Sequence, residues 1–172
     1  YDSYKMNVYP SHRTAAWPDF IYKATAENAT TAELQGTDLV LNAKLGFPFP
    51  IPKNGAEVIW NHKLKWRGNA VKRYNNQLIV QPTGKFTLTK IVEDVKFYYA
   101  NSENPQPLTK DNQMFLKYLS QPIAPPRKAV TFSLVHEKGG LGDAGRAAWL
   151  YSPALKRIRR APTVCCDNPY EG

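Results

Sequence analysis

Cysteine and histidine are scarce in this chain of 172 residues, which holds two cysteines and three histidines. Cys165 and Cys166 are adjacent, so a disulfide between them would strain the backbone severely, and they lack the two-residue gap of zinc and dithiol motifs. The histidines are scattered, and the segment that starts at His136 has Gly140 where a zinc protease has its second histidine. We therefore expect two free thiols, no metal site and no cofactor.

Long hydrophobic runs and nucleophile motifs are also absent. The mean hydropathy is −0.50, and no run reaches the roughly 18 apolar residues of a membrane-spanning helix. No serine lies in the GxSxG pattern of a nucleophile elbow. Glu93 and Asp94 form an adjacent acid pair, but neighbouring residues of a strand point to opposite faces and could not flank one substrate bond. The sequence predicts neither a membrane-spanning chain nor an enzyme.

One glycine-rich segment, Gly140 to Gly145, matches the GxGxxG pattern of dinucleotide-binding proteins. That pattern binds a pyrophosphate only where a helix begins at the glycines, because the N-terminus of the helix holds the anion. Here the next segment, Arg146 to Tyr151, is short, aromatic and followed by Ser152-Pro153, which is typical of a strand. This favours a glycine-rich hairpin loop over a nucleotide site.

The net charge is +9, from 23 Lys and Arg against 14 Asp and Glu. Such a charge suits an anionic partner, such as nucleic acid, a lipid headgroup or a membrane surface. Most of it is scattered, and aromatic residues next to basic ones match no RNA-binding signature, so we expect no nucleic-acid partner. The dense run is a candidate contact surface for a partner, or a solvated strand whose charges prevent edge pairing. It consists of Lys156, Arg157, Arg159 and Arg160.

Aromatic residues and proline are abundant, with 10 Tyr, 7 Phe, 4 Trp and 14 Pro, which favours sheet surfaces and extended connections. From residue 71 onward apolar residues often recur at every second position, as in an antiparallel sheet with one covered face. The alternation is clearest where Phe132, Leu134 and His136 are separated by single residues that are polar or smaller. The predicted strands are Tyr4–Tyr9, Asp38–Lys44, Val71–Val80, Lys85–Ile91, Val95–Ala100, Ala129–Glu137, Arg146–Tyr151 and Leu155–Arg160.

Three helices are predicted beside these strands. One starts at Pro18 and runs to about Leu34. A second, Gly55–Trp66, begins with a capping-box-like pair, Asn54 and Glu57. A third covers Asp111–Leu119. Proline-rich connections are expected at Phe47–Pro52, as a strap packed on the core or a proline-recognition segment, and at Pro122, Pro125 and Pro126. The fold class is α+β, with helices packed across a curved antiparallel sheet.

This arrangement would gather large apolar side chains in one place. Alternation puts the sheet members on one face, and the predicted helices would lay the others across it. Such a hydrophobic cleft can bind an apolar ligand without any catalytic group, although the same residues could pack a dry core. The candidate ligand-binding residues are Trp60, Phe86, Leu88, Phe115, Phe132, Leu134, Trp149 and Tyr151.

Two segments carry a resemblance to known proteins. The proline-rich segment Phe47–Gly55 with its continuation Glu57–His62, and the later segment Trp149–Pro162, resemble the proteobacterial family known as domain of unknown function 1329. The later segment also resembles the wider group of lipoprotein-sorting proteins related to LolA and LolB, in which a W-x-Y-x-P-x-x-x-x-x-R-R pattern recurs in a strand pair.

The resemblance implies an open half-barrel whose concave face is closed by helices and holds acyl chains or another apolar ligand. It implies a periplasmic, possibly outer-membrane-associated protein, made with a signal peptide and often encoded near hydrophobe exporters. We expect residues 1–172 to form a single domain, a fragment of that longer protein. The predicted function is a carrier of lipid or another hydrophobic molecule. The alternative is a structural or adaptor part of an envelope or efflux complex, with a transporter protein as partner and peripheral membrane association.

Overall fold

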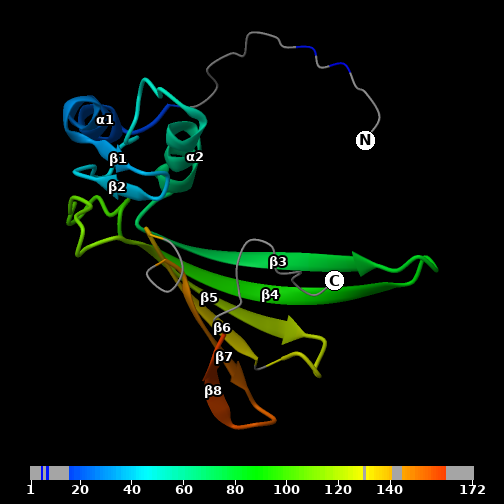
Figure 1. Cartoon of the computed structure of the whole chain (residues 1–172). Helices are drawn as coiled ribbons and strands as arrows, with labels where there is room; N and C mark the ends of the chain where they lie inside the picture. Colours follow the sequence, from blue (N-terminus) through cyan, green and yellow to red (C-terminus); the bar gives the residue numbers. More distant parts are fainter. Residues whose placement is uncertain (1–4, 6, 8–15, 130, 141–144, 162–172) are drawn as a thin grey trace.

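The computed structural model describes residues 5, 7, 16–129, 131–140 and 145–161. Two helices and two antiparallel sheets make an α+β fold (Figure 1). The elements are, in order, α1 (Asp19–Thr31), β1 (Glu33–Gln35), β2 (Leu39–Leu41), α2 (Gly55–Leu64), β3 (Ala70–Val80), β4 (Phe86–Phe97), β5 (Met114–Ala124), β6 (Phe132–Lys138), β7 (Ala147–Ser152) and β8 (Arg157–Arg160).

The larger sheet is a six-stranded meander in which each strand pairs with the next, in the order β3-β4-β5-β6-β7-β8. All five pairings are antiparallel. The sheet does not close, so β3 and β8 are its two edges. The strands fan out strongly, since β3 and β4 lie across Figure 1 while β7 and β8 point down it, in keeping with the twist of sheets.

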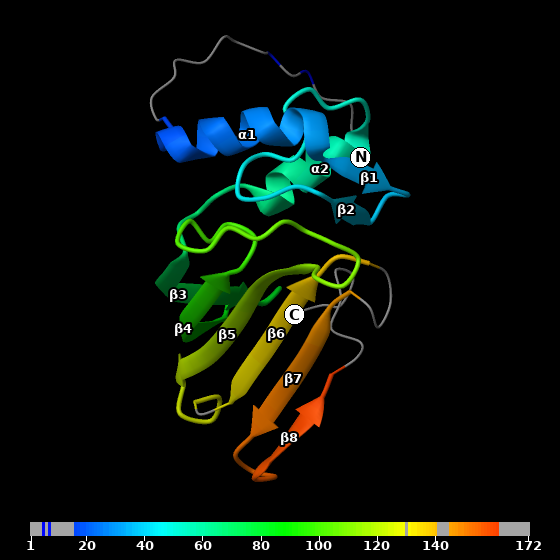
Figure 2. The same ribbon diagram turned by 90° about the vertical axis from the view of Figure 1, so that its left-hand side faces the viewer.

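The two helices and the small sheet form a layer at one end of the large sheet (Figure 2). α2 begins as the capping box predicts, because the Glu57 backbone N–H donates to the Asn54 Oδ1 atom at 3.0 Å. The proline-rich strap is tied to the same helix, since the Asn61 side chain accepts from the Phe49 N–H at 2.9 Å and donates to the Phe49 carbonyl at 2.6 Å. Pro48 and Phe49 are buried, so the strap packs on the core.

The connection between β4 and β5, residues 98–113, joins this layer to the sheet. Leu108 donates to the Ala43 carbonyl at 2.9 Å and accepts from the Asn42 N–H at 2.8 Å. The Gly140 N–H, which follows β6, donates to the Asp38 carbonyl at 3.1 Å. Backbone hydrogen bonds of this kind fix the helical layer against the ends of the central strands.

Strand register divides the large sheet into two faces, because residues directly opposite each other in an antiparallel pair point to the same side. One face carries Val71, Val95, Tyr118 and Ala148, and we call it the helix face. Its end packs against Trp60 and Leu64 of α2 in the main hydrophobic core. The other face, which we call the open face, carries Leu88, Leu119, Leu134 and Trp149.

The expected placement of the helices is therefore wrong in one respect. The alternation of apolar residues in the sequence correctly predicted that one face of the sheet carries Phe86, Leu88, Phe132, Leu134, Trp149 and Tyr151. The core contacts of α2, however, are with side chains of the opposite face. The apolar face was expected beneath the helices, but the helical layer covers the end of the other face.

The segment Asp111–Leu119 is a second correction, because it contributes to β5 and is not a helix. Its apolar residues match helical spacing, but a bulge between Met114 and Leu116 interrupts the strand alternation there. Pro122, expected in a connection, lies within β5 beside a second irregularity, where a strand tolerates proline.

The remaining boundaries differ less. The two strands predicted at Lys85–Ile91 and Val95–Ala100 form the single long β4. The first helix ends at Thr31, and Leu34 lies in β1. The predicted strand Tyr4–Tyr9 falls largely outside the described residues, as do both cysteines.

Candidate functional site

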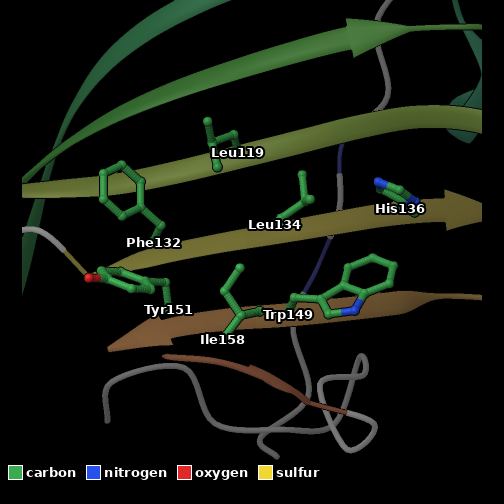
Figure 3. A pocket seen from close by; sticks show the side chains of 7 residues that line it. All are labelled: Leu119, Phe132, Leu134, His136, Trp149, Tyr151 and Ile158. Carbon is green, nitrogen blue, oxygen red and sulfur yellow. The ribbon is translucent and has the colours of Figure 1, made fainter. Parts of the chain in front are cut away.

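A groove of about 730 Å³ lies on the open face, over β5 to β8 (Figure 3). Its size is within the range of roughly 300–1,000 Å³ that small-molecule sites have. Among the described residues that line it, polar side-chain atoms come only from a histidine ring, an indole N–H and a phenol, so this part of the wall is overwhelmingly hydrocarbon. The lining residues are Leu119, Phe132, Leu134, His136, Trp149, Tyr151 and Ile158.

Two cross-strand rows build this groove. In the first row Leu119 lies opposite Leu134, which lies opposite Trp149. In the second row, two residues further along the strands, Phe132 lies opposite Tyr151, with their ring centroids 6.1 Å apart. Ile158 of β8 extends the second row. Neighbouring strands are about 4.8 Å apart, so each row is a continuous apolar strip across three strands.

His136 closes one end of the groove. Its ring meets the Trp149 ring edge-on, with the centroids 4.8 Å apart. Burial lowers the pKa of His136 below its usual value, and the positive charges of Lys117 and Lys138 lower this pKa further. The imidazole is consequently neutral at pH 7, and the lining residues that the structure describes include no charged side chain.

Four of the eight candidate ligand-binding residues line the groove: Phe132, Leu134, Trp149 and Tyr151. Phe86 and Leu88 share the open face but lie outside the groove, and they are 64% and 41% exposed.

The two candidates expected to come from helices lie elsewhere. Trp60, from α2, and Phe115, from β5, are buried in the main core. Their ring centroids are 5.3 Å apart, and the Trp60 indole N–H donates to the Thr37 carbonyl at 2.9 Å. They pack the protein interior and do not line the groove.

Sequence reasoning missed three residues of the lining: Leu119, His136 and Ile158. The signal for two of them was present. His136 continues the alternation of Phe132 and Leu134, and Ile158 lies between two arginines of a predicted strand. Leu119 was hidden because its segment was assigned to a helix.

The four basic candidates for partner contact lie at the edge of the sheet. Lys156 occupies the turn before β8 with a positive φ of 48°, and Arg157, Arg159 and Arg160 are exposed. Arg160 lies opposite Trp149 and so belongs to the open face, whereas Arg157 and Arg159 point to the other side. The run therefore does not form one surface, although it does charge an edge strand as a guard against further pairing.

The acid pair and part of the glycine-rich motif can also be placed in the structure. Glu93 and Asp94 point to opposite faces, because Glu93 binds Arg73 at 3.0 Å while Asp94 binds Lys72 at 3.5 Å. The segment after the glycine-rich motif is strand β7, antiparallel to β6, although residues 141–144 of the motif lie outside the described residues. Among the described residues no cluster of His, Cys, Asp and Glu could hold a metal, and no helix is long and apolar enough to cross a membrane.

Comparison with known proteins gives two matches. The family described as "Protein of unknown function (DUF1329)" matches residues 1–172. A protein of Pseudomonas aeruginosa, "Uncharacterized protein PA3922", is 39% identical over 170 residues, which are 98% of this chain and 37% of that protein. The chain thus spans little more than a third of the length of this curated relative. No solved structure is significantly similar to this chain.

Proposed function

The chain belongs to the DUF1329 family, and from this premise we propose that it is a non-enzymatic periplasmic protein that binds or carries lipid or another hydrophobic molecule. One observation carries the proposal: the apolar groove of about 730 Å³ on the open face. The proposal includes a relationship to lipoprotein-sorting proteins of the LolA and LolB type, to which the segment Trp149–Pro162 was likened from its sequence. That relationship would give the protein a periplasmic location with outer-membrane association and an acyl chain as ligand.

Exposure supports the proposal. Large apolar side chains are also exposed elsewhere on the open face, on β3 and β4. Soluble monomers seldom leave a large apolar patch uncovered unless it binds something. A ligand that covers the groove would gain about 25 cal/mol for each Å² of apolar surface removed from water. The exposed apolar residues of β3 and β4 on this face are Tyr74, Leu78, Val80, Phe86 and Leu88, which are 41% to 76% exposed.

The test has two measurements on the purified protein. Native mass spectrometry of protein isolated from cells, with organic extraction of bound material, should find lipid or another hydrophobe. A fluorescent fatty acid should bind, and the substitution Leu134→Gln should weaken its binding at least tenfold, because it places an amide in the first row of the groove. The same change at Leu88, on the open face but outside the groove, should leave affinity within about twofold. Absence of bound hydrophobe together with no uptake would refute the proposal.

A second function, a structural or adaptor role in an envelope or efflux complex, is favoured by β8. This edge strand is exposed along its whole length and carries three arginines, so it could dock on an acidic partner such as a transporter protein. Charge reversal at Arg157 and Arg159 should then abolish capture of that partner without lowering the melting temperature. Retained capture would count against this role.

A further inference from the structure

A row of basic residues lies beside the apolar rows of the groove, at the end closed by His136. Lys96 of β4 lies opposite Lys117 of β5, and Lys117 lies opposite His136 of β6. Lys138 is two residues beyond His136 and therefore points to the same face. Two residues along the strands from the first apolar row, the side chains on the open face are therefore basic.

Lys96 and Lys117 lie close together, and no acid among the described residues pairs with either. Like charges directly opposite each other destabilise a sheet, yet the Lys96 and Lys117 Nζ atoms lie 5.7 and 5.1 Å from the centroid of the same ring, that of Tyr98. Cation–π attraction offsets part of the repulsion. Within the described part of the chain, neither these two lysines nor Lys138 forms an ion pair.

Two acids that neighbour the row along the strands, Asp94 and Glu137, pair with other basic residues. Asp94, on the same face, binds Lys72. Glu137 lies on the other face of β6, where its Oε2 atom is 2.6 Å from the Arg146 Nε atom. An anion arriving from outside would therefore meet positive charge that no described carboxylate cancels.

A smaller polar cavity, of about 180 Å³, adjoins the basic row. It shares Lys96 with that row, and its Tyr98 is the ring that both lysines approach. Side-chain amides make up much of the remaining wall, and these can donate hydrogen bonds to oxygen atoms. The polar members of the lining are Lys96, Tyr98, Tyr99, Asn101, Asn104, Gln106 and Asn112.

We propose that the ligand of the groove is an anionic amphiphile, with its hydrocarbon chain on the two apolar rows and its carboxylate or phosphate head at Lys96, Lys117 and Lys138. The inference rests on the proposed function and specifies the chemical class of the ligand. Ammonium groups bind carboxylates and phosphates through strong charge-assisted hydrogen bonds. A head placed there would also relieve the repulsion between the two opposed lysines.

The experiment compares four amphiphiles with the same 16-carbon chain, each below its micelle concentration, as competitors of the uncharged probe Nile red. Hexadecanoate and hexadecyl phosphate should bind at least tenfold more tightly than hexadecanol, and hexadecyltrimethylammonium should bind most weakly. A preference between the two anions identifies the head as carboxylate or phosphate, and either result supports the inference. Inorganic phosphate alone should displace no probe, and displacement by it would overturn the inference in favour of a free-anion site.

Charge variants supply the second readout. Lys117→Glu should weaken both anionic amphiphiles at least tenfold while leaving hexadecanol within about twofold. Lys85→Glu, the same charge change in the exposed turn between β3 and β4, is the matched control and should alter none of them. Equal binding of hexadecanol and hexadecanoate, with no effect of Lys117→Glu, would overturn the inference and leave the proposed function intact. Failure of Nile red and of every amphiphile to bind would overturn both.

Discussion

The two faces of the six-stranded sheet differ in how far their large apolar side chains are exposed to solvent. On the helix face Ile91, Val95 and Phe97 are at most 8% exposed. On the open face Tyr74, Phe86 and other large side chains are more than 40% exposed. Alternation of apolar residues alone therefore does not identify the core. One face stabilises the fold, and the other offers a surface that can be occupied.

The largest difference between the faces should appear when a ring is removed from each. Phe115→Ala deletes a 4%-exposed side chain that packs on Trp60, and should lower the free energy of unfolding by about 3–5 kcal/mol because a cavity remains in the core. Phe132→Ala, in the groove, should cost less than about 1 kcal/mol, since its site is already open to water. Urea denaturation of both variants measures this comparison, and equal losses would show that the groove is part of the core.

A smaller effect is expected from the neighbouring acids Glu93 and Asp94. The Glu93 carboxylate, on the helix face, accepts from the Asn75 amide and the Tyr118 hydroxyl and pairs with Arg73. Glu93→Ala should therefore cost about 1–3 kcal/mol, because the hydrogen bonds that it removes are made to a charged carboxylate that is only 8% exposed. Asp94→Ala removes an exposed pair with Lys72 and should cost at most about 0.5 kcal/mol. Equal unfolding midpoints for the two variants would contradict this reading of the faces.

Local sequence pattern predicts much of this comparison but not all of it. Period-two alternation correctly assigned β6 and β7 and placed Phe132, Leu134, Trp149 and Tyr151 on one face. It failed at β5, because the bulge at Met114 and Leu116 breaks the alternation and leaves a spacing that suits a helix.

The side on which the helices pack could not be predicted, for a different physical reason. An apolar strand face looks the same in sequence whether helices or a ligand will cover it. Here the decision depends on long-range contacts, such as the backbone bonds of Leu108 to Asn42 and Ala43 and the packing of Trp60 on Phe115. The basic row beside the groove was equally hidden, since Lys96, Lys117 and Lys138 come together only through strand register.

The smallest expected effect is a pH dependence of the protein's stability that arises from His136 on the open face. Burial and the charges of Lys117 and Lys138 lower the pKa of His136 below its usual 6.5, so the unfolded chain binds a proton more readily than the folded one. Stability contributed by the neutral ring is then present above pH 6.5 and is lost as the pH falls through and below that value. Thermal unfolding between pH 7.5 and 5.0 should show this loss in the protein and a smaller one in His136→Gln.

His62→Gln, on the exposed side of α2, is the control and should behave like the unmodified protein. If His136→Gln keeps the full pH dependence, the titrating group lies elsewhere and the groove does not disfavour a charged imidazole.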